Sequence, residues 1–432
     1  MELGDARRVK RLIRLIEDLS AHPTKSIPVA SGGFAETKAA YRLLDNPALE
    51  WRELLEVHTH RTVERMQGHP VVLCIQDTTE LDFTSQPGIA GLGRLSYEAQ
   101  HGLYVHPTLV VTPQGLALGV VDAWMWARPP KDEVTVKESV RWVEGHEIVA
   151  DLAEQVPGTQ LVYVADREGD LRALMDAAAR RGHPADWLVR AMHHRNTAAG
   201  EKLWRRVEGT PPLGEVAFTL PAAADRPARG VCQTLYRDTV TLPTRKGAPT
   251  VTVTAILARE EQPPTGEKPI VWRLLTNRSA NTLEAVVELI EWYRKRWLVE
   301  VFFRILKSGC RVEALQLGTL ERLERALVIY LIIAWRILHL VTWGRECPNL
   351  SCEVVFDPEE WQAAWIVAHR AKPPDTPPPL GHMILLIAGF GGFLGRKRDG
   401  HPGPKAIWEG MQKVYAFAIG IAAAKQAFIP SG

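Results

Sequence analysis

The sequence predicts an α/β fold: a mixed sheet flanked by helices, with an inserted β subdomain and helical regions at both ends of the chain. Short, continuous apolar runs at 71–75 and 160–165 are typical of buried strands. Helical and strand-like stretches alternate around them, as in an α/β core. A Pro-, Gly- and Thr-rich stretch with alternating apolar residues, from about 197 to 269, predicts the β insertion. A length of 432 residues allows two or three domains.

The first 66 residues are predicted to be helical. Residues 9–19 have amphipathic spacing, and a Ser-Gly-Gly break at 31–33 precedes a second helical stretch at 36–44. Two further helical stretches are expected between residues 51 and 66. The chain therefore begins with a helical region that is distinct from the sheet.

The core follows from residue 67. After strand 71–75, a hairpin is predicted from strands 103–111 and 116–124. Helices are predicted at 136–154 and 167–181, and strands at 160–165, 185–191 and 271–276. Asn281 and Thr282 are expected to cap a long helix after the last strand. The C-terminal region is predicted to be helical, with a Pro-rich linker at 372–381.

Composition narrows the class of protein. The five cysteines form no CxxC pair, which argues against a disulfide framework or a zinc site and favours a reducing cytoplasm. The N-terminus lacks the apolar segment of a signal peptide. The longest apolar run, 326–335, is too short to cross a bilayer and predicts a buried helix. We therefore expect a soluble protein with no membrane partner.

Charge is concentrated locally, although the net charge is only +2. Basic residues cluster at 7–14, 294–311 and 396–398. Local basic clusters on a nearly neutral chain are typical of a protein that holds a polyanion in particular grooves.

One stripe of side chains carries the chemistry in the long helix after residue 282. At about 100° per residue, Tyr293, Arg296, Glu300 and Lys307 fall within roughly 60° of one another. Arg304 lies beside them on the same stripe. This pattern predicts a site for an anion and a metal on the exposed side of a buried helix.

Two aspartates at strand ends complete the pattern. Asp77 follows the run at 71–75, and Asp166 follows strand 160–165. With Glu300 on a packed helix, they form the layout of a polynucleotidyl-transfer site, although Glu80 and Glu168 are close enough in sequence to take part. Converging carboxylates repel one another unless a cation is present, and their hard oxygens select Mg²⁺ or Mn²⁺. Two such ions about 3.5–4 Å apart serve an in-line displacement at phosphorus.

These residues identify a resemblance. The spacing Tyr, two residues, Arg, three residues, Glu, six residues, Lys is complete at 293–307, and QDTTELDF around Asp77 and ADREGD around Asp166 provide the two aspartate contexts. The chain resembles the bacterial DDE transposases of the insertion-sequence-four group over nearly its whole length. The resemblance includes AYRLLDNP near the N-terminus and GGFLGRKRDG near the C-terminus.

The resemblance implies a cut-and-paste DNA transposase with an RNase H-like core. Its catalytic and metal-binding residues would be Asp77, Asp166 and Glu300, with Mg²⁺ as cofactor and Mn²⁺ as a substitute. It would nick the transposon-end inverted repeats, form and reopen a hairpin, and join the 3′-OH ends to target DNA. The enzyme would act as a homodimer in a synaptic complex, in the bacterial cytoplasm in association with the nucleoid.

The resemblance also implies DNA-binding residues and domain roles. Tyr293, Arg296, Lys307 and Arg190 would contact phosphates, and Trp272 would stack on an extruded base. Arg304, which shares the helical stripe, is also expected to bind DNA. Where the family has a basic residue two positions after Arg190, this chain has Met192. Lys38 and Arg42 are expected to contact the recognition-end DNA. Residues 1–66 would bind DNA, 67–318 would form the catalytic domain, and 319–432 would dimerise.

Two alternatives stay open at this point. A metal nuclease on the same fold would cut DNA without strand transfer. A non-catalytic, DNA-binding inhibitor is suggested by the N-terminus, because family chains normally begin earlier than Met1 does here. Serine and cysteine nucleophiles find no support, since the sequence contains no GxSxG motif.

Overall fold

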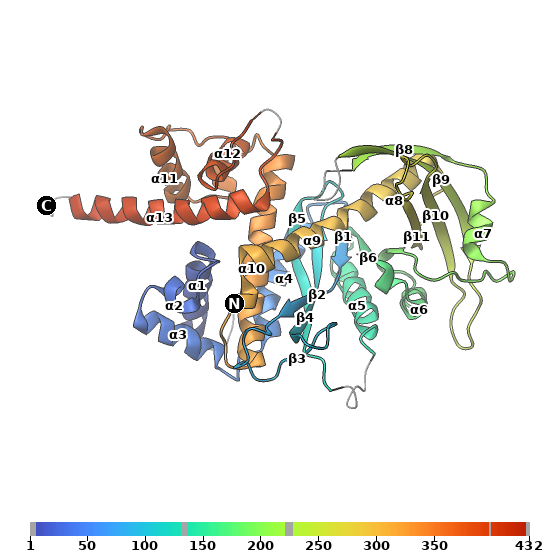
Figure 1. Ribbon diagram of the computed structural model, residues 1–432, viewed down its shortest axis with the longest axis horizontal. Helices are drawn as coiled ribbons and strands as arrows, with labels where there is room; N and C mark the ends of the chain where they lie inside the picture. Colours follow the sequence, from blue (N-terminus) through green and yellow to red (C-terminus); the bar gives the residue numbers. More distant parts are fainter. Residues whose placement is uncertain (1–5, 131–136, 221–227, 397–398, 429–432) are drawn as a thin grey trace.

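A mixed sheet runs through the centre of the molecule (Figure 1). The computed structural model describes residues 6–130, 137–220, 228–396 and 399–428, and within these ranges eleven strands join in one sheet. Lys397 and Arg398 of the last basic cluster lie outside the described residues, as does residue 136 at the predicted start of a helix.

Five strands form the central part of this sheet. Their order across the sheet is β5 (Ala117–Trp126), β4 (His101–Val111), β1 (Val71–Gln76), β6 (Gln160–Ala165) and β7 (Asp186–Arg190). Strand β4 is antiparallel to both β1 and β5, whereas β6 is parallel to β1 and β7 is parallel to β6. Three antiparallel strands followed by two parallel ones is the arrangement of an RNase H-like core. The predicted fold class is confirmed.

The inserted strands extend the same sheet beyond β7. Strand β11 (Val271–Thr276) is antiparallel to β7, and the sheet continues through β10 (Thr252–Glu260), β9 (Arg229–Thr241) and β8 (Gly214–Leu220). A short helix, α7 (Leu203–Glu208), packs against β9 and β10. At the other side, β2 (Thr79–Asp82) and β3 (Gly93–Arg94) pair with β4. The insertion thus shares the backbone hydrogen bonding of the core.

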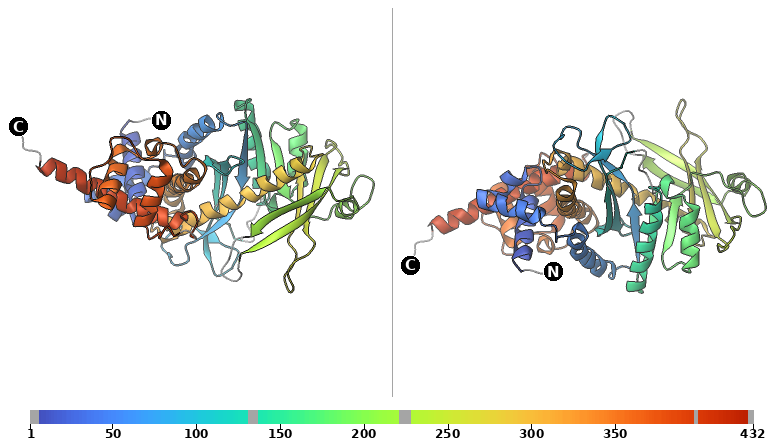
Figure 2. Two further views of the ribbon diagram at one scale, coloured as in Figure 1. Left: turned by 90° about the horizontal axis from the view of Figure 1, so that it is seen from above. Right: turned by 90° about the horizontal axis from the view of Figure 1, so that it is seen from below.

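Alternation along the strands produces two hydrophobic cores, one on each face of the sheet. In β1, Leu73 and Ile75 belong to the core that includes helices α9 (Trp297–Arg304) and α10 (Leu320–Glu346). Their neighbours Val72 and Cys74 belong to the core that includes α5 (Val140–Gln155) and α6 (Arg172–Arg180). Because a strand points successive side chains to opposite faces, a continuous apolar run can serve both cores. The two further views show these layers (Figure 2).

The helix that carries the predicted stripe consists of three pieces. Helix α8 (Leu283–Lys295) begins at Thr282, whose hydroxyl accepts a hydrogen bond from the backbone N–H of Ala285. At Arg296 the backbone makes two tight i→i−3 hydrogen bonds, and α9 (Trp297–Arg304) follows. A π-turn (Ile305–Gly309) then widens the helix. The prediction of one regular helix was therefore wrong, since the turn tightens at one point and widens at another.

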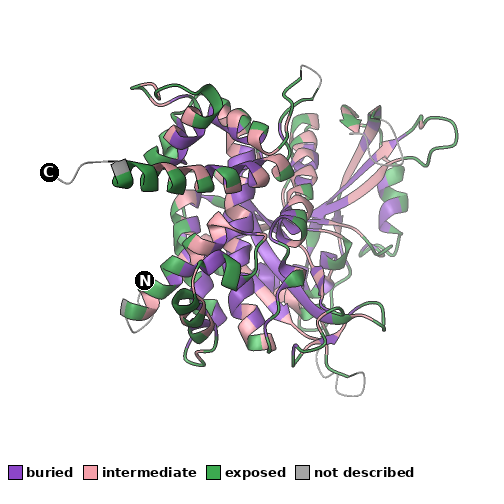
Figure 3. Ribbon diagram, turned by 60° about the vertical axis from the view of Figure 1, so that its left-hand side comes forward, coloured by how far each residue is buried: buried purple, intermediate pink, exposed green. Residues whose placement is uncertain are grey.

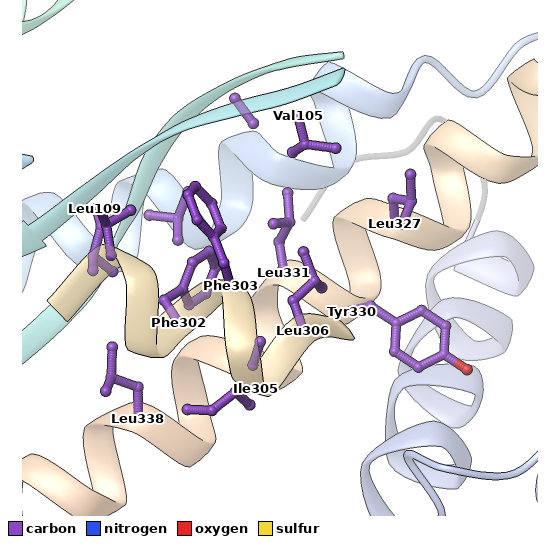
Figure 4. Close-up of a cluster of buried hydrophobic side chains, with 14 of the residues drawn as sticks. Val105, Leu109, Phe302, Phe303, Ile305, Leu306, Leu327, Tyr330, Leu331 and Leu338 are labelled. Atoms are coloured by element: carbon purple, nitrogen blue, oxygen red, sulfur yellow. The ribbon is translucent and has the colours of Figure 1, made fainter. Parts of the chain in front are cut away.

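The widened turn and the end of α9 are packed into the core. Phe302, Phe303, Ile305 and Leu306 are all buried, and they contact the sheet on one side and α10 (Leu320–Glu346) on the other (Figure 4). These four residues span more than one helical stripe. Phe302 and Phe303 lie in α9, and Ile305 and Leu306 lie in the widened turn, so both pieces of the helix contribute to the same core.

Helix α10 is longer than its apolar run predicted. It has 27 residues and is the one described helix long and apolar enough to cross a membrane by length and composition. Its most apolar window is 72% buried inside the protein, and core helices of soluble proteins pass the same test. The expectation that the segment is too short was wrong, whereas the expectation of a buried helix is met.

Helices at the two ends of the chain pack around α10 (Figure 1). The N-terminal ones are α1 (Ala6–Ala21), α2 (Ile27–Ser31), α3 (Phe34–Leu44) and α4 (Trp51–Met66). The last is one continuous helix instead of the two predicted stretches. The C-terminal ones are α11 (Pro358–His369), α12 (Leu380–Phe390) and α13 (Pro404–Phe428). The end of α13 projects from the molecule and is largely exposed (Figure 3).

Candidate active site

Two aspartates leave the sheet side by side. Strands β1 and β6 are parallel, and Gln76 is opposite Ala165 in the register. Asp77 and Asp166 are the next residues of the two strands. Asp77 accepts a hydrogen bond from the backbone N–H of Thr78, and Asp166 accepts one from the N–H of Glu168, each at 2.8 Å. The carboxyl ends of neighbouring parallel strands thus hold both side chains at one edge.

Helix α9 brings a third carboxylate to the same place. The guanidinium of Arg296 lies 2.6 Å from Oδ2 of Asp77 and 2.7 Å from Oε1 of Glu300. One side chain therefore links the strand aspartate to the helix glutamate. The exposed fractions of the three side chains are 16% for Arg296, 18% for Asp77 and 35% for Glu300. The site is partly shielded from water and still open on one side.

The pKa of Asp77 reflects its burial more than the charges beside it. Burial raises the pKa of Asp77 to about 6, and the negative charges of Asp166 and Glu300 add to the rise. The Arg296 guanidinium acts in the opposite direction. Burial is the largest cause, so the loss of water around the Asp77 carboxyl outweighs the stabilisation that the guanidinium provides.

The chemistry of the donor set fits a divalent metal ion. All three side chains are carboxylates, whose hard oxygens are the ligands that Mg²⁺ and Mn²⁺ prefer. Within the described part of the chain, no group of three or more His, Cys, Asp or Glu side chains is drawn together closely enough to hold a metal ion. In this arrangement the guanidinium of Arg296 lies between two of the three carboxylates.

A buried polar network lies behind Asp77. The hydroxyl of Thr78 is 2.7 Å from Nδ1 of His106 on β4, and the His106 ring contacts the Trp142 ring edge-on. Burial lowers the pKa of His106 to about 3, so this ring is neutral near pH 7. Sequence reasoning missed His106. A polar residue within the apolar stretch predicted as a hairpin strand was the available signal.

The other residues of the predicted stripe differ in their exposure to solvent. Tyr293 is only 5% exposed, so its predicted position on the exposed side is wrong. Burial raises its pKa, which keeps the hydroxyl protonated. Lys307 lies in the π-turn, 3.9 Å from Glu313, and is partly exposed. Arg304 is exposed at the end of α9. The break at Arg296 turns the N-terminal part of the stripe into the protein.

A cavity of about 480 Å³ adjoins Arg296. Its lining includes Arg190 at the end of β7, Trp272 on β11, and Tyr293. Phe218 of β8 stacks on Trp272 with ring centroids 5.4 Å apart and an angle of 14° between the rings. The cavity therefore joins a basic edge to an aromatic platform. Sequence reasoning did not find Phe218, because its partner Trp272 is far away in the chain, on β11.

The two N-terminal candidates lie elsewhere. Lys38 and Arg42 are exposed on α3, which packs with α1 and α2 (Figure 1). That helical group lies across α10 from the sheet, so the fold does not bring these two side chains to the carboxylates. Both remain candidates for a separate contact.

Comparison with known proteins matches three parts of the chain. Residues 143–336 match the family model of the transposase DDE domain. Residues 1–49 match the transposase DNA-binding family, and residues 332–429 match the Tn5 transposase dimerisation domain. Asp166 and Glu300 lie within the first match, and Asp77 precedes it.

One solved structure is similar in outline. It is the cryo-EM structure of a piggyBac transposase synaptic complex with hairpin DNA, and the match covers 98% of this chain and 73% of that chain. The two are 9% identical, with a TM-score of 0.38. Similarity at this level defines neither fold nor function.

Proposed function

This chain is a DDE transposase of the Tn5-like group, and on that premise we propose that it moves DNA by a cut-and-paste reaction at Asp77, Asp166 and Glu300. The observation that carries the assignment is the parallel pairing of β1 with β6, which delivers the two aspartates to one edge. Arg296 then ties Glu300 of α9 to Asp77.

The three carboxylates and His106 would have different roles in the active site. The three carboxylates would hold divalent cations, with Mg²⁺ as the natural ion and Mn²⁺ as a substitute. When bound, these ions stabilise charge on the attacking and leaving oxygens at phosphorus. The neutral, buried His106 fixes Thr78 and, through it, the backbone beside Asp77. The Thr78 N–H and the Arg296 guanidinium hold the two different oxygens of the Asp77 carboxylate, which fixes its orientation.

The cavity beside Arg296 would receive the distorted end of the transposon. Arg190 and Arg296 provide guanidinium forks for phosphate oxygens, and the protonated hydroxyl of Tyr293 provides a donor. Lys307 and Arg304 would contact phosphates farther along the helix. Trp272 would stack on a base extruded from the duplex, which offsets part of the unstacking cost.

We also propose domain roles. Residues 1–66 would bind the inverted repeats, with the exposed Lys38 and Arg42 of α3 as phosphate contacts. Residues 67–318 would form the catalytic domain, and residues 319–432 would join two copies in the synaptic complex. The partners would be double-stranded end DNA, target DNA and a second copy of the chain, in the cytoplasm.

A product analysis tests this function. The protein is incubated with its own element's end DNA, target plasmid and Mg²⁺, and the products are separated on denaturing gels. Hairpin ends and joined target DNA support the proposal. Nicks alone would favour a nuclease without strand transfer, and stable binding without any cleavage would favour a regulatory DNA-binding form.

A further inference from the structure

We propose that Arg296 is an internal counter-ion that keeps divalent cations out of the carboxylate site until a DNA phosphate takes its guanidinium. This inference rests on the proposed function, because it assumes that Asp77 and Glu300 are metal ligands. It adds a coupling: DNA binding and metal binding would each strengthen the other.

The guanidinium of Arg296 bridges two carboxylates. The two terminal nitrogens of one guanidinium reach two different carboxylates, Nη1 to Asp77 at 2.6 Å and Nη2 to Glu300 at 2.7 Å. A divalent ion shared by these two residues would need the same oxygens. Ion and guanidinium therefore compete for one place.

Arg296 also balances the negative charge of these two carboxylates. The cation beside Asp77 and Glu300 is Arg296, whereas the Lys307 ammonium lies near Glu313, at 3.9 Å. Removing the guanidinium without a replacement would leave carboxylates facing one another in a partly buried site. The arginine thus stabilises the empty site and must leave when an ion enters.

Arg296 lies between the carboxylates and the cavity proposed for DNA. It occupies the joint between α8 and α9 and also borders the 480 Å³ cavity that contains Arg190, Trp272 and Tyr293. The same side chain therefore borders both the carboxylates and the basic, aromatic cavity proposed for DNA. A phosphate in that cavity would offer the guanidinium a bidentate partner in exchange for its two carboxylates.

The exchange predicts reciprocal coupling. If phosphate binding releases the carboxylates, DNA must raise metal affinity, and metal must raise DNA affinity by the same factor. Free protein would bind Mn²⁺ weakly, and the transposase would assemble its charged site on DNA.

The test measures Mn²⁺ binding to the full chain without DNA, by electron paramagnetic resonance of free Mn²⁺. Arg296→Gln should bind Mn²⁺ more tightly than wild type by on the order of tenfold or more. Lys307→Gln is the matched control: it removes one positive charge from the same helix without opening the bridge, so its affinity should stay near that of wild type. Arg296→Lys, which supplies a point charge but no fork, should fall between wild type and Arg296→Gln.

Three outcomes decide the matter. Equal Mn²⁺ affinity in wild type and Arg296→Gln, with both folded by circular dichroism, would overturn the counter-ion role. Equal gains in Arg296→Gln and Lys307→Gln would also overturn it, because general charge would then be the cause. Adding Glu300→Gln to Arg296→Gln should remove the gained affinity. If the double variant still binds Mn²⁺ more tightly than wild type, Glu300 is not a metal ligand and the carboxylate assignment is wrong. This result is distinct from the two results that would overturn the counter-ion role.

Discussion

Asp170, which lies four residues after Asp166, forms an ion pair with Arg195, with the carboxylate fully buried and the guanidinium 14% exposed. Nη1 of Arg195 lies 2.5 and 2.7 Å from the two carboxylate oxygens, and the Asp170 side chain is fully buried. Asp170 also accepts hydrogen bonds from the backbone N–H groups of Met192 and His193. The pair ties the segment after Arg190 to the segment that begins with Asp166.

Breaking this pair should be costly. Arg195→Gln leaves a buried carboxylate without its cation, so we expect the free energy of unfolding to fall by about 3–5 kcal/mol. Urea denaturation measures the change. Arg181→Gln is the control, because its partners Asp151 and Glu154 are 62% exposed, and it should cost about 0–1 kcal/mol. Similar losses in the two variants would show that burial does not set the value of the pair.

Sequence patterns predicted the elements that depend on local signals. Strands 160–165 and 271–276 have the predicted bounds, because short apolar runs ended by polar residues define buried strands. The neighbouring positions of Asp77 and Asp166 follow from the parallel pairing of an α/β core.

Other features depend on contacts that a sequence period does not contain. The stripe from Tyr293 to Lys307 changes direction at Arg296 and again at the π-turn, since packing against the sheet and α10 overrides a constant 100° per residue. The Phe218–Trp272 stack and the Thr78–His106 hydrogen bond join residues far apart in the chain. Only the folded sheet places them together.

Lys307 should contribute to DNA affinity through charge. Lys307→Gln should weaken binding to end DNA and lower the slope of log Kd against log salt by about 1, because one phosphate contact is lost. Fluorescence anisotropy from 50 to 200 mM salt gives the slope. Lys372→Gln is the control, since its side chain is 86% exposed in the Pro-rich linker. A slope equal to that of wild type in Lys307→Gln would exclude the phosphate contact.

Trp272 should act on one extruded base. Trp272→Ala should weaken end binding by about 1–3 kcal/mol, whereas Trp272→Phe should retain part of the stacking. Abasic sites placed one by one through the terminal base pairs locate the position. At one position the Trp272→Ala penalty should largely disappear, because the stacked base is already gone. A constant penalty at every position would mean that Trp272 has only a packing role.

Stability should depend on pH through Glu324 on α10. Burial raises the pKa of Glu324 to about 7, and the neighbouring charge of Glu321 adds to the rise. Between the usual glutamate pKa and about 7 the folded state binds more protons than the unfolded state, so stability falls as pH rises through this window.

Glu324→Gln checks this sign. The variant and wild type should have similar stability at pH 4.5, and the variant should have the higher melting temperature at pH 8. Differential scanning fluorimetry across this range gives both values. A variant less stable than wild type at pH 8 would show that the ionised Glu324 is favourably paired.

Asp77, Asp166 and Glu300 are proposed to carry out DNA cleavage together. The most direct measurement compares wild type and Glu300→Ala on the element's own end DNA with Mg²⁺, using a denaturing gel for cleavage and a mobility shift for binding. We predict that wild type yields hairpin and joined products, and that Glu300→Ala binds the same DNA without cutting it. Full cleavage by Glu300→Ala would contradict the assignment of the three carboxylates.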